Sequence, residues 1–479
     1  MLIPALSFRS LSSVTDATDA LLRRLSTLGL VYASLPHQLL LEGAPLAPPD
    51  RNAVHSKALK TTVLATRTLL GPFSLEMVDA MVSWLDQGLS QVLMDAASSE
   101  DAELERVAVA VSELPVARVV LRVPLASLRT ETVAHVAAKI ERLSRVASGV
   151  VLALDAATWT LERDGIDALV ACLQTLRTSV EDTFLLAVEV STGLLAAGSA
   201  EKTLATIQRL HHCNVHVVAP GYCHGEAEET KDVVETTGGA VVDAALAFVA
   251  CLRTDRPDGL FATVVADEAG VALGLVYSSA ESIVAAVSSG RGVYYSRSRG
   301  GLWKKGESSG HTQQLIRIDV DCDSDALRFT VRQTGAGFCH LNTRSCWGHD
   351  RGLRALESML CSRHEHAPPG SYTKRLFDDT ELLRNKLVEE AQELAEAESI
   401  SDVAGEAADL MYFAMVRCVA AGCKLSDVEK MLDKRALKVK RRPGNSKAHR
   451  IAAANEILHG KALPDDDSSS ATSAKSDQS

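Results

Sequence analysis

A run of alternating aspartates is the first place where this sequence could do chemistry. Residues 321–325 read DCDSD. Strand geometry would send Asp321, Asp323 and Asp325 to one face and Cys322 to the other. Three carboxylates on one face repel one another unless a hard cation such as Mg²⁺ binds them. We therefore predict a strand here, with a magnesium site on its acidic face.

Three cysteines belong to the same region. Cys322, Cys339 and Cys346 provide three thiolates, which suit Zn²⁺ and leave its fourth position for water, as catalytic zinc requires. His340, beside Cys339, is the first candidate for proton transfer, and His311 is the second. Each feature also has an ordinary interpretation: a solvated strand face for the aspartates, small core residues for the cysteines, and a surface position for His311. In combination they favour a metal site.

The surrounding segment resembles the phosphoribosyl-AMP cyclohydrolases. Over about residues 255–348 it carries the motifs SRSR (296–299), WKKGESSGH (303–311), DCDSD and GFCHLNTRSCWG (337–348). Members of that family open the adenine ring of their substrate by adding water at C6 and breaking the N1–C6 bond. The resemblance implies that zinc activates this water, lowering its pKa from ~15.7 to ~7.

The same resemblance implies a homodimer with shared metal sites. Cys322 would reach across to a zinc ion held by Cys339 and Cys346 of the other chain, and the three aspartates would bind Mg²⁺. Basic and aromatic residues of the motifs are candidates for substrate binding, although a charged loop is often only solvated. These candidates are Arg297, Arg299, Lys304 and Lys305 for the phosphates, and Trp303 for stacking on the base.

A second set of carboxylates is spaced as on helices. Residues 385–416 contain NKLVEEAQELAEAE and, after it, DVAGEAADLMYFAMV. Residues three or four apart share a helix face, so Glu390 lies with Glu393, and Glu406 lies with Asp409. Two such helices packed antiparallel would bring four carboxylates together, which is unfavourable unless divalent cations bind them. Glutamate-rich surface helices are the common alternative, but here Glu406 and Asp409 interrupt an apolar helix.

This segment resembles the phosphoribosyl-ATP pyrophosphohydrolases of the all-α NTP pyrophosphatase group. The group's E-x-x-E…E-x-x-D pattern matches the four acids, and SYTKRLF (371–377) and EAADLMYF fit the narrower histidine-pathway enzyme. The resemblance implies that Mg²⁺ on these acids clamps the triphosphate while water attacks between the α and β phosphates, releasing pyrophosphate. Lys386 is a candidate for substrate binding and Glu389 for catalysis. The basic run 435–442 would hold phosphate or form only a solvated helix end.

The N-terminal half predicts a scaffold for these sites. Apolar runs alternate with amphipathic helical patterns, which predicts a parallel α/β domain, either a TIM-barrel-like fold or an open doubly wound sheet. Asp95, Asp155, Glu189 and the loop GYCHGE (221–226) follow or end strands, where such folds do chemistry. No nucleotide-binding motif accompanies them, so we predict a domain without chemistry of its own. The expected strands are 90–95, 117–123, 150–156, 184–190 and 215–220, after a first buried strand at the N-terminus.

The predicted architecture is therefore multi-domain: parallel α/β, then β-rich α+β, then all-α. At TDRPDG (254–259) the pattern changes from alternating strands and helices to a β-rich segment with turns, which marks the first domain boundary. HAPPGS (366–371) is a linker. The last residues are small and polar and should be disordered. The predicted domains are the α/β domain 1–250, the small dimeric cyclohydrolase domain 251–350, a helix and linker 351–371, the helical pyrophosphohydrolase domain 372–447, and a tail 448–479.

Composition restricts the class of protein. A net charge of −11 and a pI of about 5.7 argue against general binding to nucleic acid or acidic membranes. Ten cysteines in 479 residues are not the disulfide framework of a small secreted domain. The sequence contains no apolar run of ~18–20 residues that would span a bilayer. The N-terminus lacks a secretory signal, and a buried strand is preferred there over a mitochondrial transit segment. We predict a soluble cytoplasmic enzyme without membrane or nucleic-acid partners.

The order of the segments resembles the fungal multifunctional histidine-biosynthesis proteins. Trifunctional members continue after a segment like ALKVKRRPGNSK (436–447) into a histidinol dehydrogenase that uses NAD; this chain stops at Ser479, so we expect no NAD chemistry. Plant and bacterial bifunctional members lack the N-terminal domain, so the resemblance to them implies nothing about its role. The alternatives are a nucleotide-sanitising pyrophosphatase with a structural zinc, and a scaffold that recruits pathway enzymes. A weaker hypothesis is that the N-terminal domain binds the cyclohydrolase product.

Overall fold

The computed structural model describes residues 1–8, 16–41, 52–125, 133–154, 166–190, 200–223 and 241–439, with residues 451, 452, 454, 457 and 458. Our predictions for Asp155, for the GYCHGE loop beyond Cys223 and for the basic run and tail beyond Val439 lie outside the continuous ranges. The chain forms two compact units. The first is Met1–His349 with Asp433–Lys440, and the second is Asp350–Leu432 with Arg441–Ser479.

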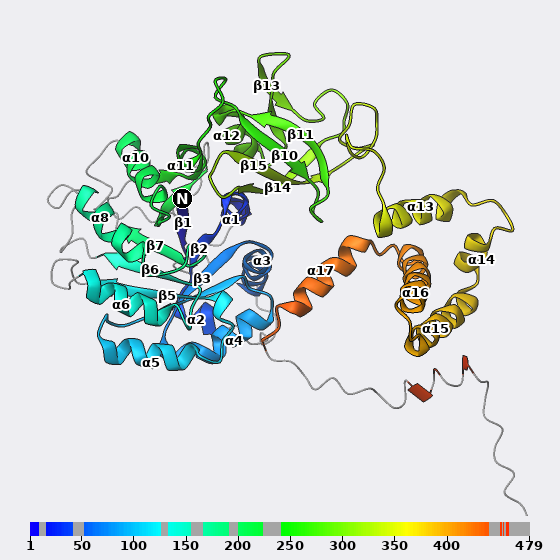
Figure 1. The fold of residues 1–479 in the computed structure, drawn as a ribbon, viewed down its shortest axis with the longest axis horizontal. Coiled ribbons are helices and arrows are strands. Elements are labelled where there is room, and N and C mark those ends of the chain that lie inside the picture. The colour runs from blue at the N-terminus through cyan, green and yellow to red at the C-terminus, as the bar shows by residue number, and fades with distance from the viewer. Residues whose placement is uncertain are drawn as a thin grey trace, which may run out of the picture. The chain divides into compact units, whose positions relative to one another are not determined.

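The first unit begins with a closed barrel of eight parallel strands (Figure 1). Neighbouring strands pair in chain order, and Leu2 of β1 pairs with Val217 of β8, which closes the ring. The predicted parallel sheet is confirmed, and of the two predicted forms it is the barrel. The strands are β1 (Leu2–Ser7), β2 (Val31–Ser34), β3 (Thr68–Phe73), β4 (Gln91–Asp95), β5 (Val119–Leu125), β6 (Gly149–Leu154), β7 (Leu185–Val190) and β8 (His216–Tyr222).

Helices cover the outside of the barrel (Figure 1). Their apolar residues recur at helical spacing, as in α6, where Val136, Ile140 and Leu143 are buried against the sheet side. The helices of this part are α1 (Asp16–Leu28), α2 (His37–Leu41), α3 (Asn52–Ala65), α4 (Val78–Asp86), α5 (Asp101–Val111), α6 (Val133–Leu143), α8 (Ile166–Arg177), α10 (Ala200–His211) and α11 (Ala244–Cys251), with 3₁₀ turns η2 (Leu75–Met77) and η3 (Val116–Arg118).

A single layer of side chains fills part of the barrel interior. Each of the eight strands contributes one residue to this cluster, and none is more than 8% exposed. The interior is therefore packed at this level and is not a pore. The residues are Ile3, Tyr32, Leu69, Leu93, Val120, Val151, Ala187 and Val218.

After β9 (Val242–Asp243) and α11, the first unit continues with a six-stranded sheet. The strand order is β13-β12-β11-β10-β15-β14, and α12 (Ala280–Ser289) lies between β11 and β12 in the chain. A Ser279–Ser282 capping box begins α12, and Gly290 ends it with a left-handed φ of 63°. The strands are β10 (Phe261–Ala266), β11 (Ala272–Ser278), β12 (Val293–Ser296), β13 (Gly301–Lys304), β14 (Gln313–Val320) and β15 (Ala326–Gln333).

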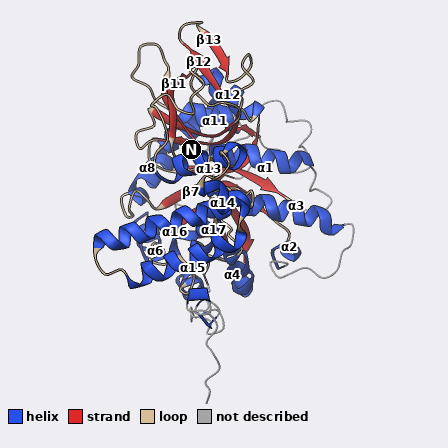
Figure 2. Ribbon diagram, turned by 90° about the vertical axis from the view of Figure 1, so that its right-hand side faces the viewer, coloured by secondary structure: helices blue, strands red, loops and turns tan. Residues whose placement is uncertain are grey.

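The second unit is built from helices (Figure 2). The predicted all-α character of this part of the chain is confirmed. Leu360, Leu376, Leu383, Phe413 and Val416 lie in its buried core. None of the helices in the described part of the chain combines the length and apolar character needed to cross a bilayer. The helices are α13 (Gly352–His366), α14 (Tyr372–Asp378), α15 (Thr380–Glu396), α16 (Ile400–Ala420) and α17 (Leu425–Ala436), of which the last four residues belong to the first unit.

Gly149 is a position where an added methyl group should destabilise the barrel. Its Cβ would lie 2.5 Å from the Cβ of Leu185 and 2.7 Å from that residue's carbonyl oxygen, on the neighbouring strand β7. We expect Gly149→Ala to lower the free energy of unfolding by about 1–3 kcal/mol, as overpacking does. Glu105→Ala, on the exposed side of α5, is the control and should change it by less than about 0.5 kcal/mol. Urea denaturation followed by circular dichroism measures both, and equal effects would contradict this strand pairing.

Candidate metal sites

The acidic run forms a turn and not a strand. β14 ends at Val320 and β15 begins at Ala326, so residues 321–325 connect the two strands of a hairpin. Asp321 stabilises the turn by accepting the backbone N–H groups of Asp325 (3.0 Å) and Ala326 (3.1 Å). The predicted strand is therefore wrong. Polar residues at every second position fit an exposed turn as well as a strand face, so the pattern could not separate the two.

The turn nevertheless brings the three carboxylates together. Oxygen atoms of Asp321, Asp323 and Asp325 lie within 4.8 Å of one another, and all three residues are exposed. Repulsion, first from Asp323, raises the pKa of Asp325. Burial raises the pKa of Asp321, but the N–H groups of Ala326 and Asp325 outweigh it and hold that pKa below its usual range. A divalent cation would relieve the remaining repulsion.

The loop after β15 holds the two other cysteines. The N–H of Cys339 donates to the carbonyl oxygen of Thr343 (3.1 Å), which closes a tight loop. The N–H of Cys346 donates to the carbonyl oxygen of Leu273 (2.8 Å) in β11. Both cysteines are therefore positioned by the backbone of the sheet and its adjoining loop.

The sulfur atoms of Cys339 and Cys346 interact with each other. Hydrogen bonds, chiefly from the N–H of Leu341 and also from Cys346, lower the pKa of Cys339. Burial and the neighbouring sulfur raise the pKa of Cys346. Lys305 belongs to the same cluster: burial lowers its pKa, and the two sulfurs partly oppose that effect. Two adjacent sulfurs beside a lysine are an arrangement that favours metal binding with loss of protons from the thiols.

Cys322 does not join this pair within one chain. Among the residues that the structure describes, the groups of three metal-ligating side chains within 4.8 Å are both acidic, and the three cysteines do not form one. Cys322 is exposed in the turn, whereas Cys339 is buried. Of the three predicted zinc ligands, the structure therefore brings two together within the chain.

The two candidate histidines occupy different surroundings. His340 is exposed, and its Nδ1 lies 3.8 Å from the Sγ of Cys339. His311 is half-buried and packs against Gly335, where a Cβ would come within 2.1 Å of its Nδ1. That Nδ1 accepts the N–H of Ala336 (3.2 Å), so Nε2 carries the proton in the neutral ring.

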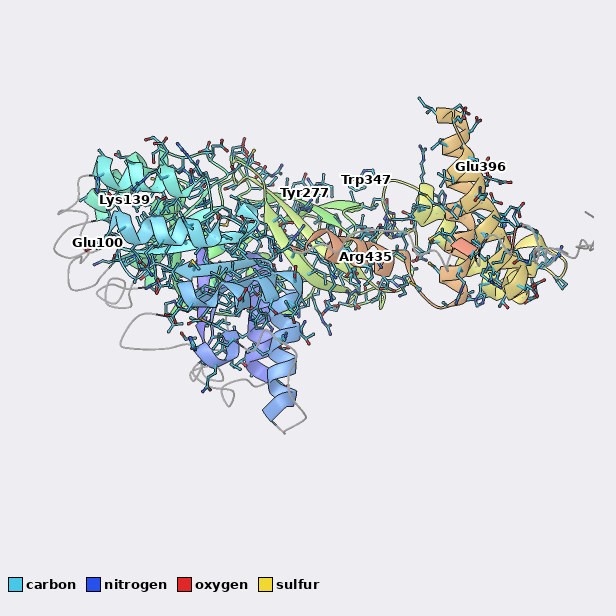
Figure 3. The ribbon with its side chains drawn as sticks, turned by 90° about the horizontal axis from the view of Figure 1, so that it is seen from below. Glu100, Lys139, Tyr277, Trp347, Glu396 and Arg435 are labelled. Atoms are coloured by element: carbon cyan, nitrogen blue, oxygen red, sulfur yellow. The ribbon has the colours of Figure 1, made fainter. Side chains whose placement is uncertain are left out.

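The candidate substrate-binding residues lie on the β12–β13 hairpin. Arg297 and Arg299 are exposed in the turn between the two strands. The guanidinium of Arg297 lies 4.1 Å from the centre of the Tyr277 ring, which is labelled in Figure 3. Trp303 is half-buried and packs on Tyr294, with 5.8 Å between the ring centres. The first contact joins the turn to β11, the second packs the two strands of the hairpin together, and both arginines remain exposed.

In the helical unit, α15 and α16 bring acidic residues together as the helical spacing predicted. Oxygen atoms of Glu390, Glu406 and Asp409 lie within 4.8 Å of one another. Glu390 is only 5% exposed, which is unusual for a carboxylate. The fourth predicted acid, Glu393, interacts with them through its charge: burial first, then repulsion from Glu390 and Glu406, raises its pKa.

Lys386 offsets part of this negative charge. Its Nζ lies 2.6 Å from Glu390 Oε1 and 3.0 Å from Glu389 Oε2. Burial lowers the pKa of Lys386, but these two ion pairs outweigh it and raise that pKa above its usual range. The predicted substrate-binding lysine and the predicted catalytic glutamate therefore contact each other at the edge of the acidic cluster.

Arg344, which we did not single out from the sequence, also shapes the cysteine loop. It forms an ion pair with Asp267, which follows β10. Gly274 gives room to the ring of Phe338, which a Cβ at 274 would approach to 2.1 Å. Arg344 could have been predicted to belong to the site, because it lies between Cys339 and Cys346 in the sequence. No motif near Asp267 in the sequence indicates that this residue pairs with Arg344.

In the barrel, an arginine pairs with the carboxylates at the strand ends. Arg122 of β5 lies 2.9 Å from Asp95 of β4 and 2.5 Å from Glu189 of β7. Burial, followed by the charge of Glu189, raises the pKa of the adjacent Tyr32. Asp95 and Glu189 are therefore partly neutralised by one shared cation.

Two family models match adjacent parts of the chain. The model of phosphoribosyl-AMP cyclohydrolase matches residues 274–348, which contain the thiol pair and the acidic turn. The model of phosphoribosyl-ATP pyrophosphohydrolase matches residues 353–436, which contain the acidic cluster of α15 and α16.

Curated relatives carry names from the same pathway. A histidine biosynthesis trifunctional protein of Komagataella pastoris is 58% identical over 200 residues, 42% of this chain and 24% of the relative. The histidine biosynthesis bifunctional protein his7 of Schizosaccharomyces pombe is 57% identical over 195 residues, 41% of this chain and 46% of the relative. The chain thus spans about a quarter to a half of these two proteins. The histidine biosynthesis bifunctional protein HisIE of Shewanella oneidensis is 36% identical over 199 residues, 40% of this chain but 94% of the relative. The chain belongs to the family of histidine biosynthesis bifunctional proteins of the HisIE type.

Proposed function

We propose that this chain catalyses two consecutive hydrolyses of histidine biosynthesis. It converts phosphoribosyl-ATP to phosphoribosyl-AMP and pyrophosphate, and it then opens the adenine ring of phosphoribosyl-AMP. The observation that carries the proposal is that each of the two matched segments contains its own cluster of metal-ligating side chains. We further propose a cytoplasmic homodimer whose domains are 1–250, 251–350 and 372–447.

Zinc and magnesium fit the donor atoms that are present. Cys339 and Cys346 offer adjacent sulfurs, one with a lowered pKa, and Cys322 of a second chain would complete a set of three thiolates. The carboxylate oxygens of the acidic turn suit Mg²⁺. When bound, zinc supplies a water that is activated at neutral pH.

The residues around the sulfur pair have complementary parts in ring opening. N1 of the adenine ring must gain a proton as the N1–C6 bond breaks, and His340 is an exposed imidazole beside Cys339 that can transfer one. His311 presents Nε2–H, which suits a hydrogen bond to the substrate. Lys305 balances the charge of the sulfurs, and Arg297 with Arg299 binds substrate phosphate.

The helical cluster suits the earlier step. Glu390, Glu393, Glu406 and Asp409 would hold Mg²⁺, which neutralises the charge of the triphosphate. Lys386 orients Glu390 and Glu389 through its ion pairs and is near enough to the cluster to bind a phosphate oxygen. Glu389 is the group that would take the proton of the attacking water.

Cys339→Ser should separate the two activities. It removes one sulfur ligand, so we expect the bound zinc to fall and ring opening to drop by at least about 100-fold. Pyrophosphate release should stay within about two-fold, because its acidic cluster belongs to the other compact unit and shares no residue with the cysteine loop. Metal analysis and absorbance of the adenine ring measure these effects. Loss of zinc without loss of ring opening would contradict the proposal.

Glu406→Gln should have the opposite effect. The substitution keeps the shape of the side chain and removes one negative charge from the cluster, so Mg²⁺-dependent pyrophosphate release should fall by about 100-fold or more. Ring opening of added phosphoribosyl-AMP should be retained. Glu398→Gln, an exposed residue between α15 and α16, is the control. If wild-type protein hydrolyses ordinary nucleoside triphosphates but neither phosphoribosyl compound, a nucleotide-sanitising enzyme is the better interpretation.

Mixing two inactive variants tests the shared zinc site. Cys322→Ser and Cys346→Ser should each abolish ring opening. In a mixed dimer, one site keeps Cys322 from one chain and Cys346 from the other, so random re-association should restore about a quarter of the activity. Activity before and after joint unfolding and refolding of the two proteins measures this. Ligands that all came from one chain would give no recovery.

A further inference from the structure

The middle of the acidic turn faces the barrel. Ser324 is only 8% exposed, whereas its neighbours Asp321, Cys322, Asp323 and Asp325 are all exposed. The turn therefore has a buried anchor on one side and its proposed metal ligands on the other. The groups that hold this anchor determine how the ligands are presented.

Ser324 is held by groups from outside the sheet domain's own hairpin. Its carbonyl oxygen accepts the backbone N–H of Arg253 (2.8 Å), in the segment that follows α11. Its Oγ lies 3.3 Å from Nε2 of His211, the last residue of the barrel helix α10. The barrel thus contacts the turn at its one buried residue, Ser324.

His211 lies between Ser324 and the amino group of Met1. Its Nδ1 lies 3.2 Å from the amino group of Met1. Burial, followed by the charge of that amino group, lowers the pKa of His211 to about 4, so the ring is neutral near pH 7. One ring nitrogen of the neutral imidazole donates and the other accepts, so His211 can hydrogen-bond to the amine and to Ser324 Oγ at the same time.

The backbone of Ser324 explains why the turn needs such support. Its φ is 69°, in the left-handed region that residues with a Cβ rarely adopt. Such a conformation persists where surrounding contacts over-determine it. The contacts from His211 and Arg253 act on the side chain and the carbonyl of this one residue.

A second contact joins the barrel to the same hairpin. Asp319, two residues before the turn, accepts a hydrogen bond from Arg67 (3.2 Å) at the start of β3, and also binds Arg317 and Arg328. Arg67 donates in addition to the carbonyl oxygen of Thr27 in α1 (3.4 Å). One continuous apolar core includes both barrel residues and residues of the six-stranded sheet. The barrel and the sheet are therefore packed together by apolar side chains as well as joined by these polar contacts.

We propose that the N-terminal barrel positions the acidic turn of the cyclohydrolase site, with His211 acting on it through Ser324. The inference rests on the proposed function in so far as the turn binds Mg²⁺. The part of HisIE matched by this chain is 94% of that relative, which leaves no room in it for a comparable barrel. The barrel is thus an added support for a site that the family can build without it.

The experiment measures binding of Mn²⁺, a probe for hard cations, by its electron paramagnetic resonance signal. The zinc-loaded full-length chain carries Glu406→Gln, which weakens the helical cluster, and Asp323→Asn in this background identifies the binding that belongs to the turn. We expect His211→Ala and Ser324→Ala each to weaken that binding by about 10-fold, as outer partners of metal ligands do. The double variant should be no weaker than the worse single variant, because both remove the same contact.

Two further variants separate positioning from general destabilisation. His211→Gln keeps a side-chain N–H donor and should restore most of the Mn²⁺ affinity. Arg209→Ala, on the same helix with an ion pair to exposed Asp167, should bind Mn²⁺ like the parent. Normal Mn²⁺ binding in His211→Ala, additive losses in the double variant, or no rescue by His211→Gln would overturn the inference. A parent that binds Mn²⁺ as described but opens no adenine ring would refute the proposed activity and leave the positioning role intact.

Discussion

Repulsion between carboxylates held within 4.8 Å of one another is the constraint on which both sites depend. The protein limits it in two ways. In the helical unit, Lys386 forms ion pairs with Glu390 and Glu389. In the turn, backbone N–H groups donate to Asp321. Neither arrangement reaches every acid, and Asp325 and Glu393 have raised pKa values. Both clusters therefore keep an excess of negative charge, which a divalent cation would neutralise.

The parts of the fold that follow from local pattern were predictable. Apolar runs of strand length separated by amphipathic helices require a parallel sheet covered on both faces, and such a sheet was found. Helical spacing predicted that Glu406 and Asp409 share one face of their helix, because a helix repeats every 3.6 residues whatever surrounds it. For the acidic run, residues 321–325, the same reasoning predicted a strand, and that prediction was wrong. Alternating polar residues describe an exposed turn as well as a strand, and only the pairing of β14 with β15 decides between them.

Contacts between distant segments had no local signature. His211 and Ser324 are 113 positions apart, and Arg67 and Asp319 are 252 apart. A histidine at a helix end and a serine between aspartates carry no sequence signal of a contact with each other. Their contact depends on the tertiary structure, which brings the two segments together. The thiol pair is similar: its spacing suggested a three-cysteine site, but the backbone that fixes Cys346 to β11 separates the pair from Cys322 in the same chain.

These long-range contacts bear on why a barrel precedes the matched segments. A short turn with several metal ligands must keep most of its side chains directed outward, so few of its own residues remain to anchor it. Here a single buried serine in a left-handed conformation carries the anchoring, and its partners come from α10 and the segment after α11. The contacts from the barrel and from Arg253 are thereby made by Ser324 and not by the aspartates. His211 and the N–H of Arg253 can then stabilise the strained conformation of Ser324 without hydrogen-bonding to any carboxylate oxygen that a cation would need.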